Sequence, residues 1–135
     1  MQSIYIFLFS GFMLANCSAQ IKDSISIEYK AVTRGSQISL LANSEGIIYK
    51  SYDKNLELKI SEDQWNEIKD LVFSIDLDAM KNLIPPSTES HTDRAMIGSL
   101  LINKNGQIYE SSTFDHGNPP SEIKELIDTL FELAD

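Results

Sequence analysis

The stretch LELKISEDQWNEIKDLV, residues 56–72, contains the point at which the hydrophobic pattern changes from that of a strand to that of a helix. Its first five residues alternate between apolar and charged side chains, as in a strand with one buried face. Ser61 and Gln64 then form a capping box, in which each side chain accepts a hydrogen bond from the other residue's backbone amide. Apolar residues follow at helical spacing from Trp65 to Ile75. We therefore expect a strand that leads directly into a helix of about four turns.

Three further alternating segments precede this stretch, at residues 24–33, 37–42 and 47–52. In the first of them Ile25, Ile27 and Tyr29 share one face, which is the pattern of a half-buried strand. Short turns that contain Gly, Asn or Asp separate the segments. Four short strands joined by tight turns are typical of an antiparallel meander with one face in water.

The segment between the helix and residue 96 is the least regular part of the chain. Leu77, Met80 and Leu83 are spaced as in a short helical turn, and the two prolines that follow end it. The remaining residues are polar and predict a loop. Loops longer than about 12–15 residues are uncommon in compact domains unless they are functional or mobile.

Residues 96–114 predict a hairpin, because Asn105-Gly106 is the preferred pair for a two-residue type I′ turn. Its first strand, Ile97–Ile102, is apolar on both faces, so we expect it inside the sheet rather than at an edge. A second helix closes the chain, with apolar residues at helical spacing from Ile123 to Ala134. Asn118 is its expected N-cap and Pro119 its expected first residue.

The expected order of elements is therefore ββββ-α-ββ-α. This order predicts an α+β domain, in which a mostly antiparallel sheet of about six strands carries both helices on one face. We expect this single domain at residues 25–135.

Composition limits the class of protein and of partner. The chain has 135 residues, 42% of them hydrophobic and 23% charged, which is ordinary for one globular domain. Its net charge of −9 repels the phosphates of nucleic acids and anionic lipid headgroups. We expect no nucleic-acid partner and no direct adhesion of the domain to a membrane surface.

The N-terminal residues predict export. Residues 4–15 are almost wholly apolar, too short for a membrane-spanning helix of roughly 20 residues but suited to a secretory signal. The string LANC places the only cysteine, Cys17, where a lipoprotein signal would have its acylated residue. We expect a signal peptide at residues 1–16, a fatty-acid (palmitate) anchor on Cys17 and a short tether at residues 17–24. The alternative is cleavage after Ala19, which would release a soluble secreted protein.

Two histidines lie beside acidic residues in loops. His91 and Asp93 lie in the loop before the predicted hairpin. Asp115 and His116 lie just beyond the second strand of that hairpin. If Glu89, His91 and Asp93 are extended they share one side, and the two loops could then converge on a divalent metal or form an acid–base pair. No spacing matches a known zinc pattern, so we assign no catalytic residue, metal or cofactor.

Two smaller groups of residues have alternative interpretations. Arg34 and Arg94 either bind a loop carboxylate such as Asp115 or bind an anionic ligand. The tyrosines of the predicted strands either form a patch on the sheet face away from the helices or belong to the core. They are Tyr29, Tyr49, Tyr52 and Tyr109.

Three short strings resemble segments of small uncharacterised lipoproteins of flavobacteria and other Bacteroidetes: LANCSAQ (14–20), YKAVTRG (29–35) and FDHGNPPSEI (114–123). The resemblance implies an anchored position in the cell envelope, facing the periplasm or the cell surface, and the same order of elements. It implies no activity. The sequence therefore predicts an exported, lipid-anchored binding module without catalysis, with a possible protein partner in the envelope.

Two other functions stay open. One is a metal-dependent or acid–base enzyme that uses His91, Asp93, Asp115 and His116. The other is an immunity-type inhibitor whose acidic surface blocks a basic toxin, with a strongly acidic neighbourhood on one face as its signature.

Overall fold

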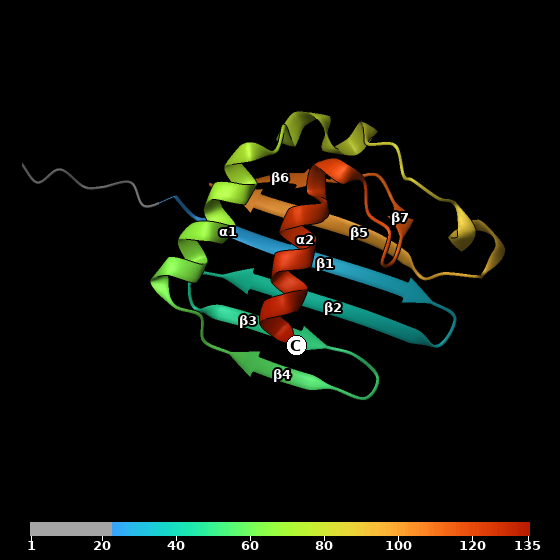
Figure 1. Cartoon of the computed structure of the whole chain (residues 1–135), viewed down its shortest axis with the longest axis horizontal. Helices are drawn as coiled ribbons and strands as arrows, with labels where there is room; N and C mark the ends of the chain where they lie inside the picture. The colour runs from blue at the N-terminus through green and yellow to red at the C-terminus, as the bar shows by residue number, and fades with distance from the viewer. Residues whose placement is uncertain (1–22) are drawn as a thin grey trace, which may run out of the picture.

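A computed structural model describes residues 23–135 (Figure 1). The expected signal peptide, Cys17 and most of the expected tether lie outside these residues. The elements, in chain order, are β1 (Ile25–Thr33), β2 (Ser36–Asn43), β3 (Gly46–Lys50), β4 (Asn55–Leu58), α1 (Glu62–Ser74), the 3₁₀ helices η1 (Leu77–Asn82) and η2 (Glu89–Thr92), β5 (Ile97–Lys104), β6 (Gln107–Glu110), β7 (Phe114–Asp115) and α2 (Ser121–Ala134).

The strands form one antiparallel sheet in the order β4-β3-β2-β1-β5-β6, with the two-residue β7 also paired to β5. Both helices cross the same face of this sheet (Figure 1). The expected α+β class and the order of strands and helices are confirmed, and β5 lies inside the sheet as expected. None of the helices within residues 23–135 is long and apolar enough to span a membrane.

The core lies between the sheet and the helices. Along β1, Ile25, Ile27, Tyr29 and Ala31 are buried, while the residues between them face the other side. Trp65, Ile68 and Val72 of α1 and five residues of α2 cover this face. Those five are Ile123, Leu126, Ile127, Leu130 and Ala134.

Helix α1 begins as the sequence predicts. The Gln64 amide donates to Ser61 Oγ at 3.1 Å, and the Ser61 amide donates to Gln64 Oε1 at 2.8 Å. This capping box satisfies backbone donors that the first turn would otherwise leave without partners.

The predicted start of α2 is wrong. Asn118 does not cap the helix, which begins at Ser121 after Pro120 in an extended conformation with ψ 143°. The backbone amide of Asn118 instead donates to the Asp115 carbonyl, and its side chain donates to Ser87 Oγ at 2.8 Å. The Pro119-Pro120 pair explains the delay, because a residue before proline is disfavoured in helical geometry.

The predicted Asn-Gly turn is confirmed, and it also holds the start of the domain. Asn105 and Gly106 have φ values of 53° and 86°, as a type I′ turn requires. The Asn105 side chain accepts a hydrogen bond from the Ser24 amide at 2.9 Å and donates to the Asp23 carboxylate at 3.1 Å. The chain therefore enters the sheet at the end where the β5–β6 turn lies.

Glycine is required at position 46 because β3 and β4 approach closely there. A Cβ atom on Gly46 would lie 2.0 Å from the carbonyl oxygen of Leu58, which is a backbone atom of the paired strand. At Gly35, in the β1–β2 turn, an added Cβ would meet nothing within 4 Å.

We predict that Gly46→Ala lowers the free energy of unfolding by about 3 kcal/mol, because the steric overlap adds to backbone strain. Gly35→Ala, the matched control, should cost about 1 kcal/mol of backbone strain alone. Urea-induced unfolding measures both values. Equal losses in the two variants would show that the approach of β3 to β4 is looser than the structure has it.

Candidate functional site

The carboxylate of Asp115 binds the loop that precedes β5. It accepts hydrogen bonds from Ser87 Oγ at 2.5 Å, the Glu89 amide at 2.7 Å and the Ser90 amide at 2.8 Å, and the residue is only 3% exposed. The Ser87 side chain, followed by the other donors, holds the pKa of Asp115 well below its usual range. Asp115 thus caps η2 from a distant part of the chain.

This capping determines where the other candidate residues lie. The expectation that Glu89, His91 and Asp93 share one side of an extended segment is wrong, because residues 89–92 form η2 and Asp93 is left-handed with φ 56°. His91 and Asp93 are exposed. Within residues 23–135, no three His, Cys, Asp or Glu side chains are grouped so that they could hold a metal ion.

His116 binds a different part of the molecule from its neighbour in the chain. Its Nδ1 lies 2.6 Å from the hydroxyl oxygen of Tyr29. Its ring packs among aromatic side chains, with its centroid 5.8 Å from that of Tyr29 and 6.0 Å from that of Phe131. Burial raises the pKa of Tyr29, so its hydroxyl keeps its proton, and the tautomer of His116 sets which of the two groups donates. Burial lowers the pKa of His116, which favours the neutral ring.

The expected arginine–Asp115 pair is wrong. Arg34 and Arg94 are exposed, and the ion pairs of the described residues are Lys30–Glu28 and Lys124–Asp128. Two backbone amides and a serine hydroxyl take the place that we expected an arginine to fill.

The tyrosine patch is also wrong, and the core interpretation holds. Tyr29 is buried, while Tyr49 and Tyr109 are half-buried and pack against the core under the helices. Tyr52 lies beyond the end of β3, in the turn to β4, and is 91% exposed.

The feature that sequence reasoning missed is the uneven distribution of charge over the fold. Helices α1 and α2 carry eight carboxylates and two lysines, a net charge of −6, whereas residues 25–58 carry four acidic and four basic side chains. The helix carboxylates belong to Glu62, Asp63, Glu67, Asp70, Glu122, Glu125, Asp128 and Glu132. The signal was present in the sequence, since these residues occupy the polar positions of two helices expected on one sheet face.

A shallow groove of about 520 Å³ runs between the two helices on this acidic surface. All but one of its lining residues have polar or charged side chains, four of them carboxylates, and Leu71 is the one apolar residue: Asp63, Asn66, Glu67, Asp70, Leu71, Ser74 and Glu125. We call this the helix groove. The carboxylates are spread along it rather than gathered on one point, which suits an extended basic surface better than a single cation.

Searches against protein-family models, curated proteins and solved structures give no match to this chain. The helix groove and the two hydrogen-bonded residues, Asp115 and His116, are therefore assessed from their geometry alone.

The His116–Tyr29 pair predicts a loss of stability in mild acid. The unfolded chain takes up a proton on His116 near the ordinary pKa of 6.5, while the folded protein resists protonation until lower pH. The unfolding free energy should therefore be highest above pH 6.5 and fall as the pH drops through the lowered folded pKa. Urea titrations between pH 7.5 and 5 measure this slope.

The matched variants are His116→Asn and His91→Asn. Asparagine at position 116 cannot titrate, so that variant should lose the slope in addition to any loss of ring packing. The exposed His91 makes no such bond, and its variant should keep the slope. An unchanged slope in His116→Asn would show that another group causes it.

Proposed function

We propose that this chain is an exported, lipid-anchored envelope protein that binds a basic protein partner through the helix groove and performs no catalysis. The observation that carries the proposal is the concentration of net charge on α1 and α2, with the groove between them. The expected leader with Cys17 supports the location.

Electrostatics favour a partner on this surface. Seven of the eight helix carboxylates are exposed, and the eighth, Asp128, is half-exposed and paired with Lys124. Charges spaced within a Debye length of about 8 Å add their potentials instead of being screened from one another. A field of one sign raises the association rate of an oppositely charged partner and rejects acidic ones.

The expected tether joins the domain where β1 begins. The described chain begins at Asp23, whose carboxylate accepts a hydrogen bond from Asn105 Nδ2 in the β5–β6 turn. Seven residues between Cys17 and the first strand span up to about 25 Å when extended. Such a tether keeps the domain near the membrane while the acidic surface, which anionic lipid repels, stays free.

An immunity-type inhibitor is the second candidate, and the acidic helix face is the observation that favours it. In this case the basic partner is a toxin, and binding in the helix groove blocks its active surface. Purified partner would then lose its activity at a one-to-one ratio with this protein, whereas a partner of another kind would not.

The anchor is tested by mass spectrometry of the mature N-terminus. We predict a chain that begins at Cys17 and carries the added mass of acyl groups, because two or more chains are needed for stable anchoring. The Cys17→Ser variant should appear in the soluble fraction or stay unprocessed. A mature chain that begins at Gln20, or one that retains its initiator methionine, would contradict the anchor.

The helix groove is tested by site-specific photo-crosslinking in intact envelopes. A photoreactive residue in place of Asn66, in the groove, should capture a protein of net positive charge. The same residue in place of Gln37, which is exposed on the other face of the sheet, should not capture it.

Charge variants complete this test. Glu67→Gln with Asp70→Asn should reduce capture at position 66 at least tenfold. The control pair, Glu110→Gln with Asp93→Asn, removes the same charge from exposed sites outside the groove and should leave capture unchanged. Capture that survives neutralisation of the groove, or that both pairs reduce equally, would contradict the proposed site.

A further inference from the structure

The face of the sheet opposite the helices carries a row of side chains that are either acidic or apolar. The strand registers place one residue of each strand in this row, which runs from β4 to β6. In spatial order it comprises Glu57, Ile48, Leu41, Glu28, Leu101 and Glu110. Apolar residues are unusual on the water-facing side of an antiparallel sheet.

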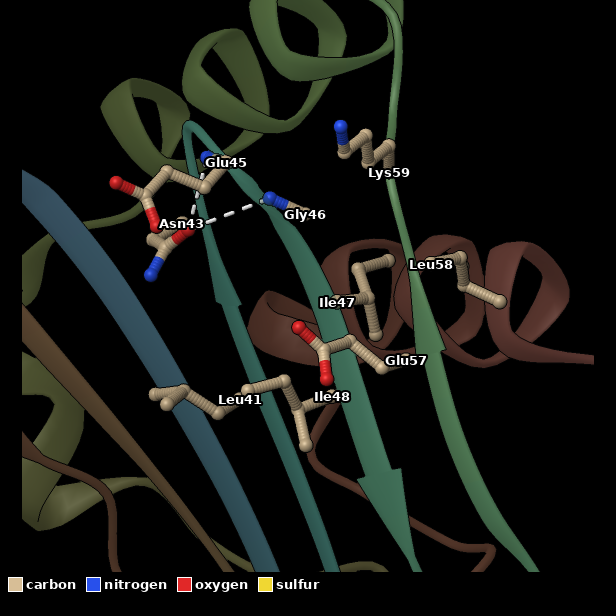
Figure 2. A pocket seen from close by; sticks show the side chains of 9 residues that line it. All are labelled: Leu41, Asn43, Glu45, Gly46, Ile47, Ile48, Glu57, Leu58 and Lys59. Carbon is tan, nitrogen blue, oxygen red and sulfur yellow. Dashed lines mark hydrogen bonds between the residues drawn. The ribbon is translucent and has the colours of Figure 1, made fainter.

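A hollow of about 440 Å³ lies at one end of this row, over β2, β3 and β4. We call it the sheet hollow. Figure 2 shows Leu41 and Ile48 side by side in it, with the carboxylate of Glu57 next to Ile48. Glu45 projects from the β2–β3 turn at the end of the hollow, where Asn43 Oδ1 accepts hydrogen bonds from the amides of residues 45 and 46.

The two carboxylates of the sheet hollow have no charged partner among residues 23–135. The ion pairs of this part of the chain involve Glu28 and Asp128, and neither Glu45 nor Glu57. Lys59 also lines the hollow, and Figure 2 shows its side chain directed from β4 toward β3, but it forms no ion pair with either carboxylate. The hollow thus combines an apolar floor with two carboxylates and one lysine, a net charge of −1.

We propose that the sheet hollow binds a lysine or arginine side chain of a protein partner. The aliphatic stem of the basic residue packs on Leu41 and Ile48, and its charged head lies near Glu57 and Glu45. Lysine and arginine match this arrangement because each joins an apolar stem to a cationic end. Leu41, 37% exposed in the free protein, would lose contact with water on binding.

A segment of a protein partner fits the sheet hollow better than a free amine or a second copy of this chain. The row continues past Glu28 to Leu101, so apolar neighbours of the basic residue also find a contact, which a free amine does not have. A second copy of this chain would bring the same carboxylates and a net charge of −9 to the contact. This inference goes beyond the proposed function, since the sheet hollow and the helix groove lie on opposite faces.

The test uses a defined peptide and the purified full-length protein. The probe is an acetylated, amidated nonapeptide in which valine alternates with arginine; the same peptide with glutamine for arginine, and free spermidine, are its controls. NMR of the Leu41 and Ile48 methyl groups should show shifts that saturate with the arginine peptide. The glutamine peptide should produce none, and spermidine should bind at least tenfold more weakly.

Variants decide whether the hollow is the binding site. Glu45→Gln with Glu57→Gln should raise the dissociation constant of the arginine peptide at least tenfold. The control, Glu110→Gln, removes a charge from the same row outside the hollow and should change it less than twofold.

Each opposite result overturns the proposal. Absence of methyl shifts, or equal effects of the hollow and control variants, would show that the hollow is not a site. Equal binding of spermidine would show a site for free amines instead of a protein partner. These results are independent of crosslinking at position 66, so the sheet hollow and the helix groove are tested separately.

Discussion

The register of β1 against its two neighbours is the constraint on which the other features depend. Ile27 lies opposite Ala42 of β2 and Ile102 of β5, and all three side chains are buried. Side chains alternate along a strand, so a slip by one residue would bring Glu28 and Lys30 under the helices. The same register builds both proposed surfaces, because it fixes which face the helices cover and which side chains form the row on the other face.

The second constraint is long-range, and it explains why residues 89–93 are not extended as we expected. Asp115 caps η2 although more than 20 residues separate it from the amides that it binds. The lowered pKa values of Asp115 and His116 resemble those of an active site, yet hydrogen bonds and burial that hold the fold account for both. The sequence places these residues beside strand ends but does not show which distant groups satisfy them.

Local signals predicted the elements well, and non-local contacts decided the rest. The capping box at Ser61 and the Asn105-Gly106 turn are complete within a few residues, so the sequence predicts them correctly. Asn118 looked like a cap by the same rules, but its side chain binds Ser87, 31 positions away. The acidic surface of the helices could be predicted only by combining two inferences. The carboxylates occupy the polar positions of each helix, and both helices pack on the same face of the sheet.

Helix stability explains only part of the placement of those carboxylates. Acidic residues in the first turn, such as Glu62 and Glu122, interact favourably with the helix dipole. Glu132 lies in the last turn of α2, where a negative charge is unfavourable by about 0.3–1 kcal/mol, and neither helix has a basic residue in its last turn. The only basic group at the end of α2 in the described residues comes from elsewhere, as Lys54 Nζ donates to the Ala134 carbonyl at 3.0 Å. The basic partner proposed for the helix groove would relieve the repulsion between these carboxylates that the free protein carries.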